Sequence, residues 1–267
     1  MTYFHYFIYG LIQGLTEFLP ISSTAHLKVL SIFLGIKDPG SSISAILQLG
    51  SVFAILYYFR KDIFSHIKSK PINLNKNFYK SKLLSSILIG SISILLIGGI
   101  IKIFFPDFSE SIFRSNLSIG IISILMALVM LFSDKSRLNS ITLRNHKLFD
   151  SLKIGIGQAL AIIPGVSRSG ITISIALLLG WKKKDATKYS FLLGIPAISI
   201  AAIVELLDSF RTFDYSILGP LLIGLITTFF ISILSIDFLI KYIPANGLKI
   251  FAYYRIIFGT IICASYL

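Results

Sequence analysis

Residues 13–26 of this chain read Gln13-Gly-Leu-Thr-Glu17-Phe-Leu-Pro20-Ile-Ser22-Ser23-Thr24-Ala-His26. This segment interrupts an apolar stretch, Tyr3 to Gly35, with a proline and a polar cluster. A second stretch, Leu152 to Gly180, is interrupted in the same way by Pro164-Gly165 and the serines that follow. Each half has about 14 residues and is ~21 Å long as a helix, which is too short to cross a ~30 Å hydrocarbon layer. The pattern predicts two re-entrant helix-loop-helix hairpins with their polar breaks near the middle of a membrane.

The composition supports a membrane environment. Of the 267 residues, 55% are hydrophobic and 14% are charged, and the mean hydropathy is +0.83. An ordinary soluble domain carries roughly 25% charged residues. Six further apolar stretches are close to the ~20 residues that cross a bilayer, and they are Ile43 to Phe59, Leu83 to Phe105, Leu117 to Phe132, Tyr189 to Leu207, Ile217 to Ile240 and Ile250 to Leu267. We therefore predict an all-α polytopic membrane protein with a single integral membrane domain over residues 1–267.

The two interrupted stretches are related by an internal repeat. Adding 144 to the residue number carries Pro20 onto Pro164 and Ser23 onto Ser167. Each repeat, 1–133 and 150–267, then holds one re-entrant hairpin and three transmembrane helices. Because three crossings are an odd number, the second repeat is expected to have inverted topology relative to the first. Inverted repeats with broken helices are common in secondary transporters, so the architecture alone does not indicate an enzyme.

Positive charge is distributed unevenly among the predicted loops. Eighteen Lys and Arg residues lie in loops 60–82, 134–153, 181–188 and 241–249, and three lie in loops 36–44, 106–116 and 208–216. By the positive-inside rule the first group is cytoplasmic, so both termini are expected outside. The net charge of +13 therefore reflects topology. No nucleic-acid partner is expected, because the basic residues are not interleaved with aromatic ones.

The first break carries residues suited to acid-base chemistry. Gln13 and Glu17 are four residues apart and share one helix face. Ser22 or Ser23 is placed to cap the outgoing half-helix, with His26 about one turn further on. A carboxylate and an imidazole at membrane depth are costly, which favours a functional site. The alternative is that Glu17 and His26 form a packing pair and the serines are only caps.

The second break carries residues suited to anion binding. Its hydroxyls and arginine are Ser167, Arg168, Ser169 and Thr172. Backbone N–H groups and the positive dipole end at a helix start attract anions, and a guanidinium can bind phosphate oxygens in a bidentate way. The alternative is an arginine that only caps helix carbonyls.

Together the two breaks predict phosphate chemistry. An acid or metal ligand, a nucleophile with a nearby base and an arginine for the developing charge are the parts that phosphoryl transfer requires. In an apolar cavity they indicate a substrate with a phosphate head and a hydrocarbon tail. Either Ser23 or water could be the nucleophile. A transporter or flippase for a lipid phosphate remains an alternative function.

The paired motifs, with the terminal segment Tyr254-Arg255-Ile-Ile-Phe-Gly259, resemble the undecaprenyl-diphosphatase family, also called UppP or BacA, over essentially the whole chain. The resemblance implies hydrolysis of the C55 isoprenoid diphosphate to the monophosphate, which recycles the carrier lipid for peptidoglycan synthesis and gives bacitracin resistance. It also implies a multi-pass protein of the bacterial plasma membrane, a long-chain polyprenyl diphosphate as substrate, dependence on a divalent cation and a site open to the outer face. A homodimer is compatible with the family.

The resemblance also suggests roles for individual residues. Glu17 would serve metal binding or water activation with Gln13, Ser23 and His26 would supply the nucleophile or its base, and the substrate-binding group would be Gln13, Ser167, Arg168, Ser169 and Thr172. Many members of the family have Glu where this chain has Gln13, which leaves Glu17 as the expected sole carboxylate. We therefore expect Mg²⁺ or Ca²⁺ to be held mainly by substrate phosphates and waters.

Other polar residues in the apolar stretches are less informative. Asp237 and Arg255 lie in consecutive predicted spans and are expected to form a structural ion pair. Lys102 and Glu205 lie near span ends, where their charged groups are expected to reach the interface. Gln48 begins the span after the first hairpin and could reach the cavity. Tyr189 holds the corresponding place after the second hairpin.

Overall fold

The computed structural model describes residues 2–36, 40–67, 74–105, 108, 112–136, 139–209 and 215–265. The described chain is helical, with one isolated bridge between Ile141 and Trp181. Its helices are α1 (Tyr3–Thr16), α2 (Ser23–Phe33), α3 (Gly40–Tyr58), α4 (Arg60–Ile67), α5 (Leu74–Phe104), α6 (Asn116–Asp134), α7 (Leu148–Ala159), α8 (Arg168–Leu178), α9 (Lys183–Ser209), α10 (Leu218–Asn246) and α11 (Lys249–Ala264). Short 3-10 turns cover Ile112–Arg114, Leu160–Ile162 and Tyr215–Ile217.

Four of the described helices are long and apolar enough to cross a membrane, which makes this a polytopic membrane protein. They contain the segments Lys82–Phe104, Asn116–Asp134, Lys183–Leu207 and Leu218–Asn246. The apolar helix Ile43–Tyr58 is shorter than these segments, and α11 has 16 residues. The crossing of the membrane by these two helices therefore stays a prediction.

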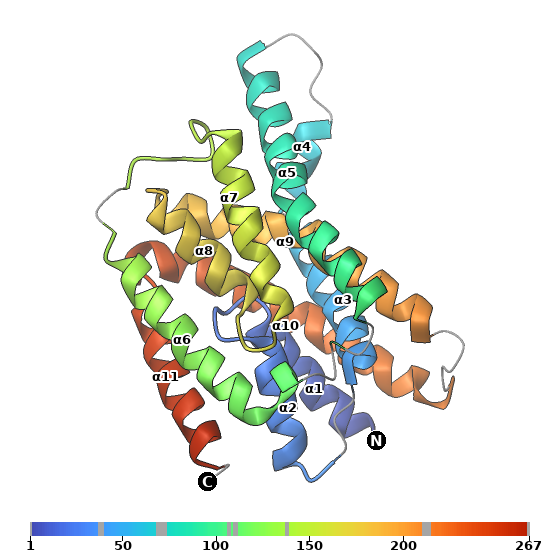
Figure 1. Cartoon of the computed structure of the whole chain (residues 1–267). Coiled ribbons are helices and arrows are strands. Elements are labelled where there is room, and N and C mark those ends of the chain that lie inside the picture. The colour runs from blue at the N-terminus through green and yellow to red at the C-terminus, as the bar shows by residue number, and fades with distance from the viewer. Residues whose placement is uncertain are drawn as a thin grey trace.

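The predicted loops are partly helical. Loop 60–82 contains α4 and the beginning of α5, because α5 starts at Leu74. The rest of this loop, 68–73, lies outside the described residues, as do 37–39, 106–107, 109–111, 137–138 and 210–214 in the other predicted loops. Figure 1 shows the N- and C-terminal ends in the lower part of the view, and α4 with the beginning of α5 in the upper part.

Both predicted breaks are present and have the same backbone conformation. Ser22 precedes α2 with φ 76° and ψ 101°, and Ser167 precedes α8 with φ 70° and ψ 111°. They are the two non-glycine residues with positive φ in the described chain. A positive φ is costly for a residue with a side chain, and such strain is typical of functional sites.

The matching conformations pair the two breaks differently from the sequence offset of 144. Helices α2 and α8 have 11 residues each and begin at Ser23 and Arg168. At the breaks Ser22, and not Ser23, therefore corresponds to Ser167, at an offset one residue larger than the sequence suggested. The reason is that the proline lies two residues before Ser22 in the first break and three residues before Ser167 in the second. Aligning Pro20 with Pro164 therefore shifts the serines by one residue.

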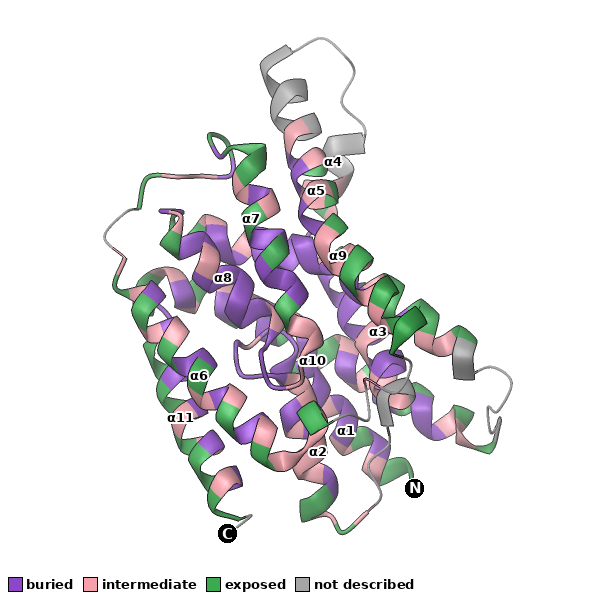
Figure 2. Ribbon diagram, in the orientation of Figure 1, coloured by how far each residue is buried: buried purple, intermediate pink, exposed green. Residues whose placement is uncertain are grey.

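The helices that precede the two breaks, α1 and α7, each pack closely on another helix. A Cβ atom at Gly10 of α1 would overlap the carbonyl group of Gly224 in α10. A Cβ atom at Gly155 of α7 would overlap the carbonyl group of Gly90 in α5. Small residues allow such close helix contacts in membrane proteins. The buried residues gather around the breaks in the centre, whereas α5 and the outer face of α11 expose many apolar side chains (Figure 2).

Candidate active site

The two breaks lie against each other in the centre of the molecule. Ser169 Oγ, at the start of α8, donates a hydrogen bond to the carbonyl oxygen of Leu19 at 3.3 Å. Arg255 of α11 also joins the breaks, because its guanidinium donates to the carbonyl oxygens of Pro20 at 3.3 Å and Gly165 at 2.5 Å. Residues about 145 positions apart in the sequence therefore form one site.

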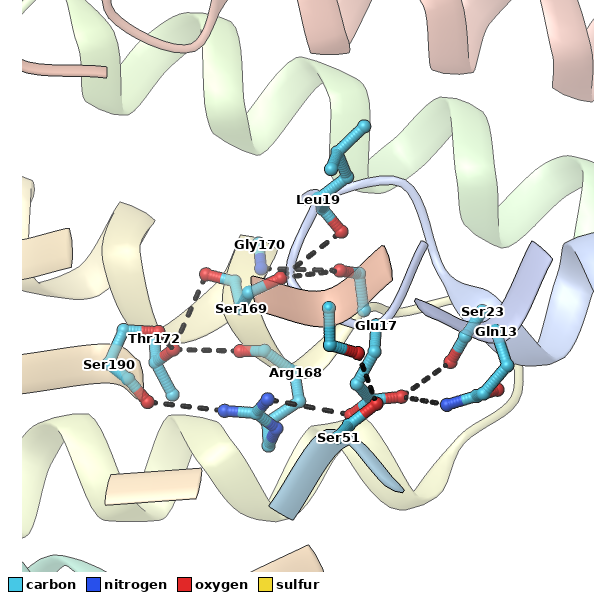
Figure 3. A network of polar contacts seen from close by, with 12 residues as sticks. Gln13, Glu17, Leu19, Ser23, Ser51, Arg168, Ser169, Gly170, Thr172 and Ser190 are labelled. Carbon is cyan, nitrogen blue, oxygen red and sulfur yellow. Dashed lines mark hydrogen bonds and ion pairs between the residues drawn. The ribbon is translucent and has the colours of Figure 1, made fainter. Parts of the chain in front are cut away.

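Glu17 is the centre of the polar network shown in Figure 3. Its Oε2 atom accepts hydrogen bonds from Gln13 Nε2 at 2.8 Å and from Ser23 Oγ at 2.9 Å. Its Oε1 atom lies 3.5 Å from Nη2 of Arg168, and both side chains are less than a tenth exposed. The structure thus brings together a carboxylate, a hydroxyl and a guanidinium.

Arg168 is fixed by Ser190 of α9 and by Glu17, the residue that follows α1. Its Nη1 atom donates to the carbonyl oxygen of Ser190 in α9 at 3.1 Å, while Nη2 faces Glu17. A Cβ atom at Gly194 would overlap the guanidinium, so the arginine needs a glycine at this place. The buried Nε atom has no hydrogen-bond partner among the described residues. The guanidinium therefore donates to a carbonyl, faces Glu17 and keeps one buried donor without a partner in the described chain.

A cavity of about 340 Å³ opens beside this network. Four of the eight sequence-predicted residues line it, and these are Glu17, Ser23, Ser167 and Arg168. Gln48, one of the two residues after the hairpins that could reach the cavity, lines it as well. Its remaining wall is largely apolar and includes Ile94, Ile162 and Ile198.

Glu205 lines the same cavity. This corrects the expectation that Glu17 is the only carboxylate near the site. Glu205 does lie near the end of the span Lys183–Leu207, as expected. Tyr189, by contrast, does not reach the cavity. Its hydroxyl is buried and donates to the carbonyl oxygen of Ser86 at 2.8 Å.

Three predicted site residues lie behind the cavity wall. Gln13, Ser169 and Thr172 are fully buried. Thr172 Oγ1 lies 2.6 Å from Ser190 Oγ and donates to the carbonyl oxygen of Arg168 at 2.8 Å. It therefore links the backbone of Arg168 to Ser190, whose carbonyl oxygen accepts from the guanidinium. Ser190 was not predicted, because one serine in an apolar span carries no signal of its own.

His26 does not face Ser23. Its Nδ1 atom lies 2.8 Å from the carbonyl oxygen of Ser22, and its Nε2 atom lies 2.7 Å from the hydroxyl of Tyr254. The ring stacks on Phe258 with centroids 4.3 Å apart. The hydroxyl of Ser23 instead donates to Glu17. The two side chains at the start of α2 therefore have different partners, and the roles of Ser23 and His26 as nucleophile or base stay a prediction.

The expected ion pair between Asp237 and Arg255 is also wrong. Asp237 accepts from Lys241 at 2.6 Å and from the hydroxyl of Tyr58 at 3.0 Å. Arg255 is fully buried, and beside its two bonds to the breaks it donates from Nε to the carbonyl oxygen of Ser123 at 3.2 Å. The terminal sequence motif contained Arg255, but only the fold shows which groups it binds.

The described residues contain no group of three or more His, Cys, Asp or Glu side chains that could hold a metal ion. The Oε1 atom of Gln13, buried behind the cavity wall beside Glu17, has no hydrogen-bond partner within the described chain. Together with the carboxylate of Glu17 it would offer two oxygen ligands. Mg²⁺ is commonly held by one or two protein oxygens with substrate phosphates and water.

Comparisons with known proteins agree with these observations. The family model described as "Bacitracin resistance protein BacA" matches residues 6–261. A protein from Prochlorococcus marinus (strain MIT 9515) named undecaprenyl-diphosphatase is 59% identical over 262 residues, covering 98% of both chains. One from Prochlorococcus marinus (strain MIT 9303) with the same name is 43% identical and covers 97% of this chain and 90% of its own. The chain belongs to the BacA family of bacitracin resistance proteins.

Proposed function

We propose that this protein is an undecaprenyl-diphosphatase, a hydrolase that converts undecaprenyl diphosphate to undecaprenyl phosphate and inorganic phosphate. The observation that carries the proposal is the convergence of Glu17, Ser23 and Arg168 from two helix breaks on one cavity with an apolar wall. The names of its relatives support the same reaction. Its product is the lipid carrier used in peptidoglycan synthesis, and membership of the family links it to bacitracin resistance.

Arg168 and the two helix starts supply the binding site for the diphosphate. The guanidinium offers a planar set of donors that matches phosphate oxygens, and its Nε atom has no protein partner in the described chain. The cavity is bordered by Ser22 and Ser23 at the start of α2 and by Ser167 at the start of α8. The positive ends of both helix dipoles therefore act on the same phosphate groups.

Ser23 and Glu17 are positioned for the chemical step. In the proposed reaction Ser23 Oγ forms a bond to the terminal phosphorus, and its proton passes to Oε2 of Glu17. The bond from this phosphorus to the bridging oxygen breaks, and undecaprenyl phosphate leaves. Water then attacks the phosphoserine, Glu17 returns the proton to Ser23 Oγ, and inorganic phosphate departs while a water proton passes to solvent. The hydrogen bond of 2.9 Å from Ser23 to Glu17 supports this assignment.

Direct attack by a water molecule on the diphosphate is the alternative, with Glu17 as the base in either case. His26 then acts as a positioning residue, since its Nδ1 atom donates to the carbonyl of the strained residue Ser22. Gln13 holds the carboxylate of Glu17 in place.

We further propose that a divalent cation, Mg²⁺ or Ca²⁺, takes part when substrate is bound. Gln13 Oε1 and the carboxylate of Glu17 would hold it together with phosphate oxygens and water, because these hard cations prefer oxygen ligands. Such an ion would neutralise part of the charge on the diphosphate.

The finer topology is also part of the proposal. We place the two breaks in re-entrant hairpins of inverted repeats in the bacterial plasma membrane, with the cavity open to the outer face. The matching conformations of Ser22 and Ser167 and the location of most basic residues in four of the predicted loops support this arrangement. The apolar side of the cavity would accept the first isoprene units of the long-chain polyprenyl diphosphate. A homodimer stays a prediction from the family resemblance.

The test is phosphate release from a polyprenyl diphosphate by the purified protein in detergent. We expect the wild type to release phosphate, and Arg168→Ala to lose nearly all activity with unchanged yield and thermal stability. Lys184→Gln, which removes an exposed charge away from the site, is the matched control and should keep full activity. Transport of a lipid phosphate requires a sealed compartment, so a folded wild-type protein that releases no phosphate in detergent would favour a transporter and refute the phosphatase.

A further inference from the structure

Two smaller cavities adjoin the active-site cavity, with volumes of about 240 Å³ and 180 Å³. Thr24 and Glu205 line all three cavities, so the three are neighbours. The smaller pair is also lined by cationic side chains from three separate segments, namely Lys28 of α2, Lys102 of α5 and Arg114, which precedes α6. We call this region, formed by Thr24, Lys28, Lys102, Arg114 and Glu205, the basic vestibule.

The location of these cations is unusual for this sequence. Of 25 Lys and Arg residues, 21 lie in the seven predicted loops, and the four others lie in apolar stretches. Two of these four, Arg168 and Arg255, lie at the helix breaks. The remaining two are Lys28 and Lys102, and both line the vestibule. Charges in apolar stretches are costly and usually mark a functional pathway.

Cations outnumber acidic groups among the described residues of the vestibule. Of the described residues that line its two cavities, three are cationic and Glu205 is acidic. Lys28 Nζ donates to the carbonyl oxygen of Arg114, and Lys102, Arg114 and Glu205 each take part in an interaction as well. Fixed cations around a cavity with low-dielectric walls attract and concentrate anions.

We propose that the basic vestibule is a second phosphate-binding site, separate from the Arg168 site and adjoining it through Thr24. Its ligand is a phosphate group with at least one charge, small enough for a cavity of about 240 Å³. The group is either inorganic phosphate leaving the active site or the headgroup of a membrane lipid. The first source rests on the proposed function, since hydrolysis would release inorganic phosphate beside Thr24, whereas the second does not.

The experiment measures equilibrium binding of radiolabelled inorganic phosphate to the purified full-length protein in detergent. Four proteins are compared: the wild type, Arg168→Ala, the double variant Lys102→Gln/Arg114→Gln and the control Lys184→Gln. The proposal expects two phosphate sites in the wild type and in the control. It expects one site in Arg168→Ala, and in the double variant the remaining site should be the Arg168 site.

Further arms distinguish the ligand sources and keep the test independent of one variant. Short-chain phosphatidate should displace the vestibule phosphate at lower concentration than inorganic phosphate does if a lipid headgroup is the natural ligand, and should not do so if free phosphate is. Each single charge neutralisation should weaken vestibule binding about tenfold, as expected for loss of one charge-assisted hydrogen bond. If Arg168→Ala fails to fold, the loss of one site between the wild type and the double variant still supports the proposal.

Equal numbers of phosphate sites in the wild type and the double variant would refute the proposal that the vestibule binds phosphate. So would loss of all binding in a folded Arg168→Ala protein. Phosphate binding requires no turnover, so activity and binding are independent results. If the wild type is inactive but the double variant binds one phosphate fewer than the wild type, the proposed phosphatase is refuted and the second phosphate site is supported. An active wild type with an unchanged number of sites would refute the vestibule alone.

Discussion

Arg255 offers the sharpest test of how the site is built. Its side chain donates to three carbonyl oxygens that belong to α6, to the first break and to the second break. Replacement by lysine keeps the charge but supplies a single nitrogen, which cannot reach three acceptors in three directions. We therefore expect Arg255→Lys to lose two of the three hydrogen bonds.

The size of the effect follows from these contacts. A hydrogen bond from a charged donor contributes about 1.5–3 kcal/mol, so two lost bonds correspond to ~3–6 kcal/mol of unfolding free energy. Native proteins are stable by only ~5–15 kcal/mol, so this is a large part of the total. Because the lost bonds join the two breaks, kcat should fall as well, through a less fixed geometry at Ser23 and Arg168.

The matched control is Asp237→Asn. If Asp237 and Arg255 formed the ion pair that their sequence positions suggest, both variants would be strongly destabilised. In the structure Asp237 instead pairs with Lys241, at the exposed i,i+4 position, and such a pair contributes only ~0.3–0.5 kcal/mol. Thermal unfolding in detergent and phosphate release, measured on the same preparations, compare the two variants. Wild-type stability in Arg255→Lys, or equal destabilisation by Asp237→Asn, would refute the reasoning.

Four further predictions test single parts of the site and fold. Ser23→Ala should lower kcat by several orders of magnitude with little change in KM if Ser23 is the nucleophile, and by ~10²-fold if water is; wild-type turnover would remove Ser23 from the mechanism. Gly194→Ala should raise KM at least about tenfold, because the added methyl group would displace the guanidinium of Arg168. The control Gly99→Ala has open space for its Cβ atom and should behave as wild type. Equal KM values for the two variants would contradict the close contact between Gly194 and Arg168. His26→Asn should retain more activity than His26→Ala, because an amide nitrogen can replace Nδ1 as donor to Ser22, and equal losses would argue against this positioning role. Burial lowers the pKa of His146 below its usual 6.5, and the nearby charge of Lys82 lowers it further. As pH falls, the histidine of the unfolded chain is protonated first, so the stability that this residue contributes is present above pH 6.5 and is lost as pH falls through that value. The thermal midpoint of His146→Gln should therefore fall less between pH 7 and pH 5 than that of the wild type.

The sequence by itself determined the features that depend on neighbouring residues. Proline followed by a serine cluster specified both helix breaks, and the spacing of four residues placed Gln13 and Glu17 on one face, where they form a hydrogen bond. The isolated arginine at the start of a half-helix was expected to face a cavity shared by both breaks, and Arg168 does line the cavity. These outcomes follow from local chain geometry, so tertiary contacts were not needed to predict them.

Only the tertiary structure decided which side chains meet across the molecule. It directed Ser23 to Glu17 and His26 to Tyr254, placed Thr172 behind Arg168, and used Arg255 to join the two breaks. It also brought Lys28, Lys102 and Arg114 from three segments to one vestibule. The physical reason is that helices in a membrane are apolar on nearly every face, so periodicity does not show which face meets which neighbour. Their pairing is set by close contacts at small residues, such as Gly10 with Gly224 and Gly155 with Gly90, whose partners lie far away in the sequence.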